Sequence, residues 1–162
     1  FNKLNDSSGV SLISTYDQRW ARRDIKSISL LPNVLSKQYA HKKEKYEALL
    51  IDNDNSITEA STANVWIIDK ENTLITRPAD TRILSGVTRN RILKIAKKYN
   101  YSVKEKKFFL KDIYKANEVF LTGTTVAIKP VTKVDDKYIS SGTPGEITNI
   151  LRKKYFEFLN NL

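Results

Sequence analysis

Residues 22–31 read RRDIKSISLL, and this stretch sets one lysine, Lys26, between apolar neighbours. A lysine held partly away from water has a lowered pKa and presents a nucleophilic amine. Such an amine forms a Schiff base with an aldehyde. A surface lysine at a strand end is the simpler interpretation, and the local context alone favours it because the chain has 28 lysine and arginine residues. The role of Lys26 therefore depends on what other segments bring to it.

A second segment, residues 57–66 (ITEASTANVW), carries one acid, Glu59, followed by small and hydroxylic residues and then a strand. Small side chains allow a flat ring to approach closely, and a fixed carboxylate can pair with a protonated ring nitrogen. A turn with a solvated acid is the alternative, and it is favoured when the segment is taken alone.

Two further segments have the composition of anion-binding turns. In residues 84–89 (LSGVTR), glycine and threonine stand directly before a predicted helix, where free backbone N–H groups and the helix dipole attract a negative group. The Thr88 hydroxyl could also donate to a phosphate, although Thr88 equally fits a simple N-cap. Residues 121–125 (LTGTT) follow a strand and could supply a second wall, but they match no nucleotide-binding fingerprint.

The composition excludes several kinds of site. The 162 residues, 40% of them hydrophobic, suffice for one domain with a core. With no cysteine and one histidine, His41, the chain is expected to have no disulfide and no metal site. No apolar run reaches the length of a membrane span, and the first twenty residues lack a signal-peptide pattern. The net charge of +10 comes from scattered lysines, which indicates solvated faces.

Hydrophobic periodicity predicts a mixed α+β domain. Strands are expected over residues 10–16, 46–51, 65–68, 74–76, 103–108, 119–122 and 127–134, with 65–68 and 74–76 forming a hairpin. Helices are expected over residues 32–43, 88–99 and 110–115, and from Pro144 onward. The buried stripe of the last helix is predicted to contain Ile147, Ile150, Leu151, Tyr155 and Phe158.

Taken together and in order, the four segments resemble the fold-type IV enzymes that use pyridoxal 5′-phosphate (PLP), and most of all the D-amino-acid transaminases. That family has Arg-x-Asp-Ile-Lys, then Thr-Glu-x-Ser-x-x-Asn, then Leu-x-Gly-Ile/Val-Thr-Arg, then a Thr/Ser-rich turn before an apolar-Pro-Val strand. Here the motifs stand at residues 22–26, 58–64, 84–89 and 122–131. The resemblance runs from about Val10 to the C-terminus. It implies the C-terminal pseudo-barrel domain of the D-amino-acid aminotransferase-like fold.

Carried over by position, the resemblance implies a PLP site and an activity. Lys26 would form the internal aldimine and then move a proton between the substrate Cα and the cofactor C4′. Glu59 would pair with the ring nitrogen, and Leu84 would pack on the ring. The implied cofactor-binding residues are Lys26, Glu59, Leu84, Val87, Thr88, Gly123 and Thr124. The implied reaction moves an amino group between a D-amino acid such as D-alanine and a 2-oxo acid such as 2-oxoglutarate.

Other interpretations fit less well. Branched-chain transaminases share residues 86–89 and 122–124 but usually have a glycine-rich stretch and a tyrosine soon after the lysine, where residues 27–31 here read SISLL. Aminodeoxychorismate lyases share the Ile-Lys pair but resemble the glutamate and glycine segments less. A basic nucleic-acid-binding module would need aromatic side chains among basic ones on an exposed face. The aromatic residues near 104–107 look instead like core positions of a strand.

Residues 1–9 (FNKLNDSSG) read as an interdomain linker before a lysine-bearing domain over residues 10–162. Because the sequence contains no methionine, we expect a preceding N-terminal domain, which in the family supplies a phosphate-binding arginine, a tyrosine near the cofactor and groups that grip the substrate carboxylate. The resemblance implies a cytoplasmic homodimer with amino-acid and 2-oxo-acid substrates and no nucleic-acid or membrane partner. This chain alone is expected to be inactive.

Overall fold

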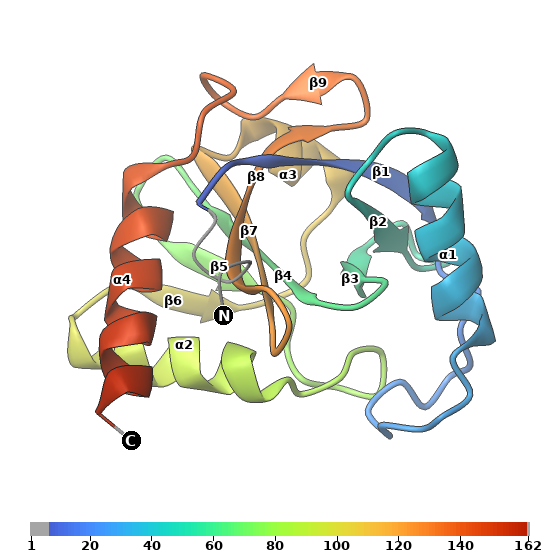
Figure 1. Cartoon of the computed structure of the whole chain (residues 1–162), viewed down its shortest axis with the longest axis horizontal. Helices are drawn as coiled ribbons and strands as arrows, with labels where there is room; N and C mark the ends of the chain where they lie inside the picture. The colour runs from blue at the N-terminus through green and yellow to red at the C-terminus, as the bar shows by residue number, and fades with distance from the viewer. Residues whose placement is uncertain (1–6, 162) are drawn as a thin grey trace.

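A strand near the start of the chain forms the middle of a curled sheet. The computed structural model describes residues 7–161, in which β1 (Val10–Tyr16) runs parallel to both β2 (Glu47–Ile51) and β8 (Ala127–Val134). The remaining strands are β3 (Ile57–Ala60), β4 (Asn64–Ile68), β5 (Leu74–Thr76), β6 (Val103–Glu105), β7 (Glu118–Gly123) and β9 (Lys137–Tyr138). Their order is β3-β2-β1-β8-β7-β4-β5-β6, with β9 paired to β8. Strands β3 and β4 stand far apart in this order but contact each other, which shows that the sheet curls into a half-barrel (Figure 1).

The helices cover different parts of this sheet. They are α1 (Leu31–Lys42), α2 (Val87–Lys98), α3 (Leu110–Lys115) and α4 (Glu146–Asn160). In Figure 1, α2 and α4 lie against each other on one side of the molecule, whereas α1 lies on the other side against β2. The mixture of helices with a curled, mostly antiparallel sheet confirms the predicted α+β class and pseudo-barrel architecture.

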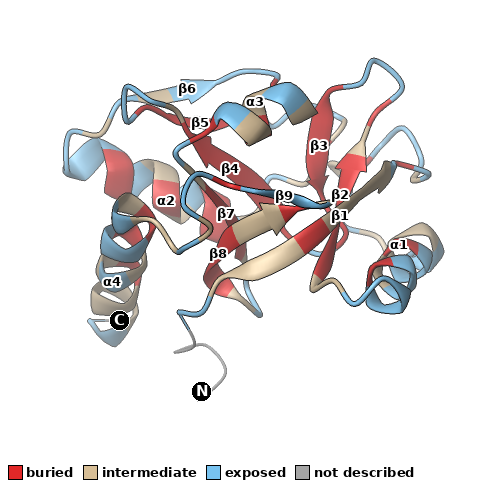
Figure 2. Ribbon diagram, turned by 90° about the horizontal axis from the view of Figure 1, so that it is seen from above, coloured by how far each residue is buried: buried red, intermediate tan, exposed pale blue. Residues whose placement is uncertain are grey.

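The core has two main parts, one on each face of the sheet. One cluster packs under α3 and includes Phe108 and Ile113. The other lies beneath α2 and α4, where the Trp66 and Phe120 rings stack with their centroids 5.5 Å apart. Figure 2 shows β4, β5 and β7 largely buried, β1 mostly of intermediate burial and much of α1 exposed. Each buried large apolar side chain contributes about 1.5–3 kcal/mol of transfer free energy, so the core holds the strand ends in fixed positions.

Most elements agree with the sequence-based prediction. The bounds of β1, β8 and α3 are as predicted, and β4 and β5 form the expected antiparallel hairpin with Ile67 opposite Ile75. His41 is exposed, as expected. Residues 10–16 alternate only weakly but are rich in β-forming residues, and this composition locates β1 in the sequence.

The structure corrects two local predictions that concern the candidate site. Residues 57–60, where no strand was predicted and a turn was favoured only for the segment taken alone, form β3, and all four are buried because they pair antiparallel with β2. Thr88 is not an N-cap: Gly86, in an extended conformation, occupies that position, and Thr88 lies buried inside the first turn of α2. Both differences place polar groups in the interior.

Three further predictions fail at the edge of the core. The strand expected over residues 103–108 ends at Glu105, after which Phe108 turns into the core with 1% of its surface exposed. Tyr99, expected as a core position, is 42% exposed at the end of α2. Ile150 is 37% exposed and lies outside the buried stripe of α4, whereas Leu151 and Tyr155 are buried as predicted.

Part of the predicted linker lies beyond what the structure covers. Residues 1–6 are outside the described residues, and residues 7–9 belong to no helix or strand. Across residues 7–161, no helix combines the length and the apolar character that crossing a bilayer requires.

Candidate active site

A buried carboxylate on β3 is the centre of the candidate site. Glu59 is 5% exposed, and its two oxygens face three donors. Arg19 donates to Oε1 through NH1, the Asn64 side-chain amide donates to Oε2 at 2.9 Å, and the Leu84 N–H lies 3.4 and 3.3 Å from the two oxygens. Asn64 also donates to the Leu84 carbonyl at 2.8 Å. The carboxylate is therefore fixed, as a partner for a ring nitrogen must be.

Burial dominates the electrostatics of Glu59. Loss of water raises the pKa of this carboxyl to about 7, while Arg19 and the Leu84 N–H act in the opposite direction. A carboxyl with a pKa near neutrality changes its charge in the pH range in which most enzymes work.

Arg19 is itself held by a second carboxylate. Asp17 accepts from the Arg19 Nε at 2.9 Å and from NH2 at 2.7 Å, and it also accepts from the Thr58 hydroxyl at 2.7 Å. Burial alone would raise the pKa of Asp17, but the hydrogen bonds and charge of Arg19, with Thr58 and Arg23, bring it below its usual value. Burial lowers the pKa of the Arg19 guanidinium, but the carboxylates of Asp17 and Glu59 raise it more, so that this pKa lies above its usual value.

The start of α2 lies beside Glu59 and offers an anion site. Its N-cap, Gly86, has no side chain, no other side chain caps the helix, and its first turn holds no acid. The backbone N–H groups there remain available to a negative group. A Cβ on Gly86 would come within 2.2 Å of the Asn64 Oδ1, so only glycine fits there. Val87 is 82% exposed, whereas Thr88 is 3% exposed.

The β7–β8 turn brings the second predicted phosphate wall to the same region. Thr122 pairs with Asn64 across β7 and β4, and a Cβ on Gly123 would lie 3.4 Å from the Thr62 carbonyl oxygen. Thr124 is exposed at the tip of the turn. Asn64 therefore links the carboxylate, the start of α2 and this turn.

Lys26 lies in the connection between β1 and α1 and is exposed. The partial desolvation expected for it is absent from this chain, because no described segment covers it. The connection is tied to the site segments at two points: the Arg23 N–H donates to the Thr81 carbonyl at 2.9 Å, and the Asn33 amide donates to the Ser61 carbonyl at 2.7 Å. In Figure 1 this connection, the segment before α2 and the β7–β8 turn lie on the same side of the molecule.

Sequence reasoning missed three residues of this arrangement. Asn64 stands in a quoted motif but was given no role, and Asp17 and Arg19 were not singled out. An acid and an arginine two residues apart directly after a strand were the available signal. That signal could not show that Arg19 would reach Glu59, which is 40 residues away in the chain.

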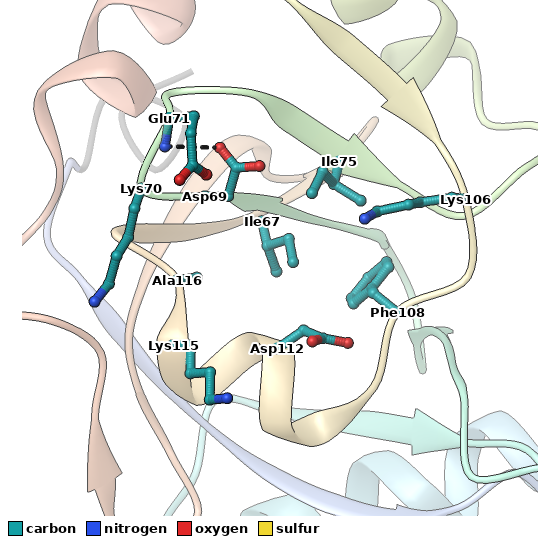
Figure 3. A pocket seen from close by; sticks show the side chains of 10 residues that line it. All are labelled: Ile67, Asp69, Lys70, Glu71, Ile75, Lys106, Phe108, Asp112, Lys115 and Ala116. Atoms are coloured by element: carbon teal, nitrogen blue, oxygen red, sulfur yellow. Dashed lines mark hydrogen bonds between the residues drawn. The ribbon is translucent and has the colours of Figure 1, made fainter.

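A hollow of about 310 Å³ lies elsewhere, between the β4–β5 hairpin and α3 (Figure 3). Its apolar lining comes from Ile67, Ile75 and Phe108, and charged side chains such as Asp112 and Lys115 surround it. None of the predicted cofactor-binding residues lines it. The candidate site is thus an open surface of this chain rather than this hollow.

Comparison with known proteins identifies the family of this chain. Residues 5–134 match the family model of amino-transferase class IV. The chain belongs to this family. The family resemblance inferred from the four motifs is thereby confirmed, and it covers the segments that carry Lys26, Glu59 and Leu84.

Individual relatives of this class IV chain include two D-alanine aminotransferases. The one from Listeria innocua serovar 6a is 43% identical over 96% of this chain and 53% of its own length, and the one from Bacillus licheniformis is 41% identical over 87% and 49%. A solved branched-chain amino acid aminotransferase from T.th., with pyridoxamine 5′-phosphate, has a TM-score of 0.84 at 29% identity, over 92% of this chain and 50% of that one. The chain spans about half the length of the curated relatives it matches.

Proposed function

We propose that this chain is the lysine-bearing domain of a PLP-dependent transaminase that moves an amino group between a D-amino acid, such as D-alanine, and a 2-oxo acid, such as 2-oxoglutarate. The observation that carries the proposal is the buried, triply hydrogen-bonded Glu59 beside the uncapped start of α2. The names of the D-alanine aminotransferase relatives support the substrate class.

The residues present fit the cofactor. A carboxylate has about four acceptor positions. Arg19 and Asn64 each donate to one oxygen of Glu59, and the single Leu84 N–H is shared between both oxygens at 3.4 and 3.3 Å, so a protonated ring nitrogen can still be accepted. The backbone of Val87, with Thr88, Gly123 and Thr124, would hold the phosphate, because the first turn of α2 has no cap of its own. When bound, PLP supplies an electron sink that lets the substrate Cα release a proton.

Three residues of this chain would have separate roles at the bound cofactor. Lys26 Nζ would hold the cofactor covalently and move a proton between the substrate Cα and the cofactor C4′. Glu59 would keep the proton on the ring nitrogen, and Leu84, whose backbone N–H and carbonyl are fixed by Glu59 and Asn64, would pack on the ring. The exposure of Lys26 in this chain is consistent with a site that a second domain completes.

The proposal includes a further N-terminal domain, a homodimer and a cytoplasmic location. The structural support for a contacting domain or subunit is the apolar surface of the β1–α1 connection and of α1, where Ile28 is 99% exposed, Leu31 67% and Val34 58%. Monomeric proteins rarely leave such adjoining apolar side chains in water. A covering domain or subunit would remove them from solvent and enclose Lys26.

A branched-chain amino-acid transaminase is the second candidate, and the fold similarity to the solved branched-chain enzyme favours it. An aminodeoxychorismate lyase is a further alternative within the same fold. Assays of the complete protein with D-alanine or L-leucine as amino donor and 2-oxoglutarate as acceptor separate the two transaminases. Faster transfer from L-leucine would replace the D-amino-acid proposal.

The direct test of the site is chemical labelling of Lys26. We expect the complete protein to be yellow with PLP, and borohydride reduction followed by peptide mapping should find the cofactor on Lys26. Lys26→Ala should lower turnover by about 100- to 10,000-fold or more, because the amine both binds the cofactor and moves the proton. The exposed lysine Lys42, at the end of α1, gives the control variant Lys42→Ala, which should keep full activity. A label on another lysine would refute the assignment.

A further inference from the structure

A row of alternating charges runs away from Glu59 through the interior. Its members, in spatial order, are Glu59, Arg19, Asp17, Arg23, Asp52 and Arg82. The first five are almost fully buried as side chains. The row connects the segment that leads to Lys26, the end of β2, strand β3 and the segment before α2. Buried charges are costly unless each one is paired, so this ion-pair row fixes these segments relative to one another.

Within the ion-pair row, Asp17 fixes the orientation of the Arg19 guanidinium. Its Nε and NH2 both engage Asp17, so the planar guanidinium can turn only NH1 toward Glu59. Asp17 is in turn held by the Thr58 hydroxyl, whose residue is the direct neighbour of Glu59 on β3. Besides Asp17, the Arg19 guanidinium contacts Glu59 through NH1 and, at 3.5 Å, the Thr58 hydroxyl through NH2. Glu59 is therefore the only carboxylate that NH1 contacts among the described residues.

We propose that Arg19, oriented by Asp17, is a positioning residue that holds the Glu59 carboxylate charged and aimed at the ring nitrogen of the cofactor. This inference rests on the proposed function for the ring nitrogen, but the effect on Glu59 does not require a bound cofactor. Arg19 acts through Glu59 and is assigned no contact with substrate or cofactor.

The electrostatics of the site agree with this role. Burial raises the pKa of Glu59, and Arg19 is the only cation that contacts its oxygens among residues 7–161. The other groups that face Glu59 are the Asn64 amide, the Leu84 N–H and, behind Arg19, the like charge of Asp17. A neutral Glu59 could not hold a proton on the ring nitrogen. Without Arg19, burial would act unopposed by a cation and favour that neutral form.

The deciding experiment measures the titration of the Glu59 carboxyl in the cofactor-free complete protein. Carbon-13 NMR of labelled glutamate, with the signal assigned by its loss in Glu59→Gln, follows the midpoint in the natural protein and in Arg19→Gln. We expect Arg19→Gln to raise the midpoint by about one to three pH units, and Arg19→Lys to restore part of the change. The matched control is Arg22→Gln, since exposed Arg22 forms a similar pair with Asp24 on the same connection. An unchanged Glu59 midpoint in folded Arg19→Gln would overturn the proposal.

Two additional measurements keep the test decisive. If Arg19→Gln does not fold, Arg19→Lys replaces it, and this variant must move the Glu59 midpoint upward for the proposal to stand. Binding of pyridoxine 5′-phosphate, an alcohol that cannot bond covalently to Lys26, should weaken roughly tenfold at neutral pH in Arg19→Gln. If this probe does not bind the natural protein, the proposed function fails, and the Glu59 midpoint still decides the role of Arg19.

Discussion

Two acids a few residues apart show how position determines chemistry at the scale of the residue. Asp54 lies at the surface, where Lys107 and Ser56 hold its pKa well below the usual value. Glu59 lies on the next strand, where burial raises its pKa to about 7. The exposed acid remains charged at every physiological pH, whereas the buried one titrates near neutrality. The difference comes from the surrounding fold and not from the residue type.

Glu59→Gln should therefore change how stability depends on pH. The folded carboxyl has a pKa of about 7 against an ordinary 4.5, so the folded form binds more protons between these values. The free energy of unfolding of the natural chain should fall as pH rises from about 4.5 to 7, by up to roughly 3 kcal/mol, and stay level above. The glutamine variant should lack this fall. Urea denaturation at pH 5 and pH 8 measures it, with exposed Glu71→Gln as the control. Equal pH dependence in the natural chain and Glu59→Gln would contradict the pKa assignment.

At the scale of the element, the sequence predicted those strands and helices whose residues show a local pattern. Weak alternation and β-forming residues located β1, and the predicted bounds of β8 and α3 agree with the structure. Strand β3 was not predicted, because Thr58 and Glu59 look solvated until Asp17 and Arg19, some 40 residues away, are known to pair with them. The candidate site follows the same division. The order of four motifs predicted its residues, but the contacts that fix Glu59 come from distant segments that no local pattern reveals.

Helix α4 provides a prediction at this scale, because its start is stabilised by a neighbouring strand. Glu118 on β7 accepts from the Ile147 and Thr148 N–H groups at 2.9 and 2.7 Å and from the Thr148 hydroxyl at 2.7 Å. The N-cap, Gly145, has no side chain to do so. Glu118→Ala should lower the free energy of unfolding by about 1–3 kcal/mol.

Chemical denaturation of this chain measures the loss. The matched control is Glu146→Ala, which removes an exposed acid from the first turn of the same helix. If the two variants lose equal stability, a general effect of charge near the helix start explains the result, and the specific cap is wrong.

At the scale of the whole molecule, exposed apolar side chains concentrate on one side. Most of the exposed large apolar residues fall between Tyr16 and Tyr39, on the connection that carries Lys26 and on α1. The net charge of +10 is spread along the whole chain. The surface beside Lys26 is thus the part of this chain best suited to contact another domain or subunit.

Expressed alone, this chain should self-associate and transfer no amino group from D-alanine to 2-oxoglutarate. Its exposed apolar side would pair with another copy, and Lys26 would remain open to water. Leu31→Glu should reduce the association, measured by analytical ultracentrifugation. Ile150→Glu, which changes an exposed apolar residue on α4, should leave it unaltered. Turnover of the isolated chain near that of the complete protein would show that the site is complete within these residues.

The central position of β1 has a consequence for how the protein is made. Val10 pairs with Val131, so a ribosome must add about 120 residues after β1 before its second neighbour exists. At typical rates of about 5–20 residues per second, that interval is roughly 6–25 s. Throughout it, one edge of β1 stays unpaired and the nascent chain already carries Lys26. We therefore expect the protein to capture its cofactor only after translation of β8, so that the vitamin-derived group joins a finished domain and does not guide its folding.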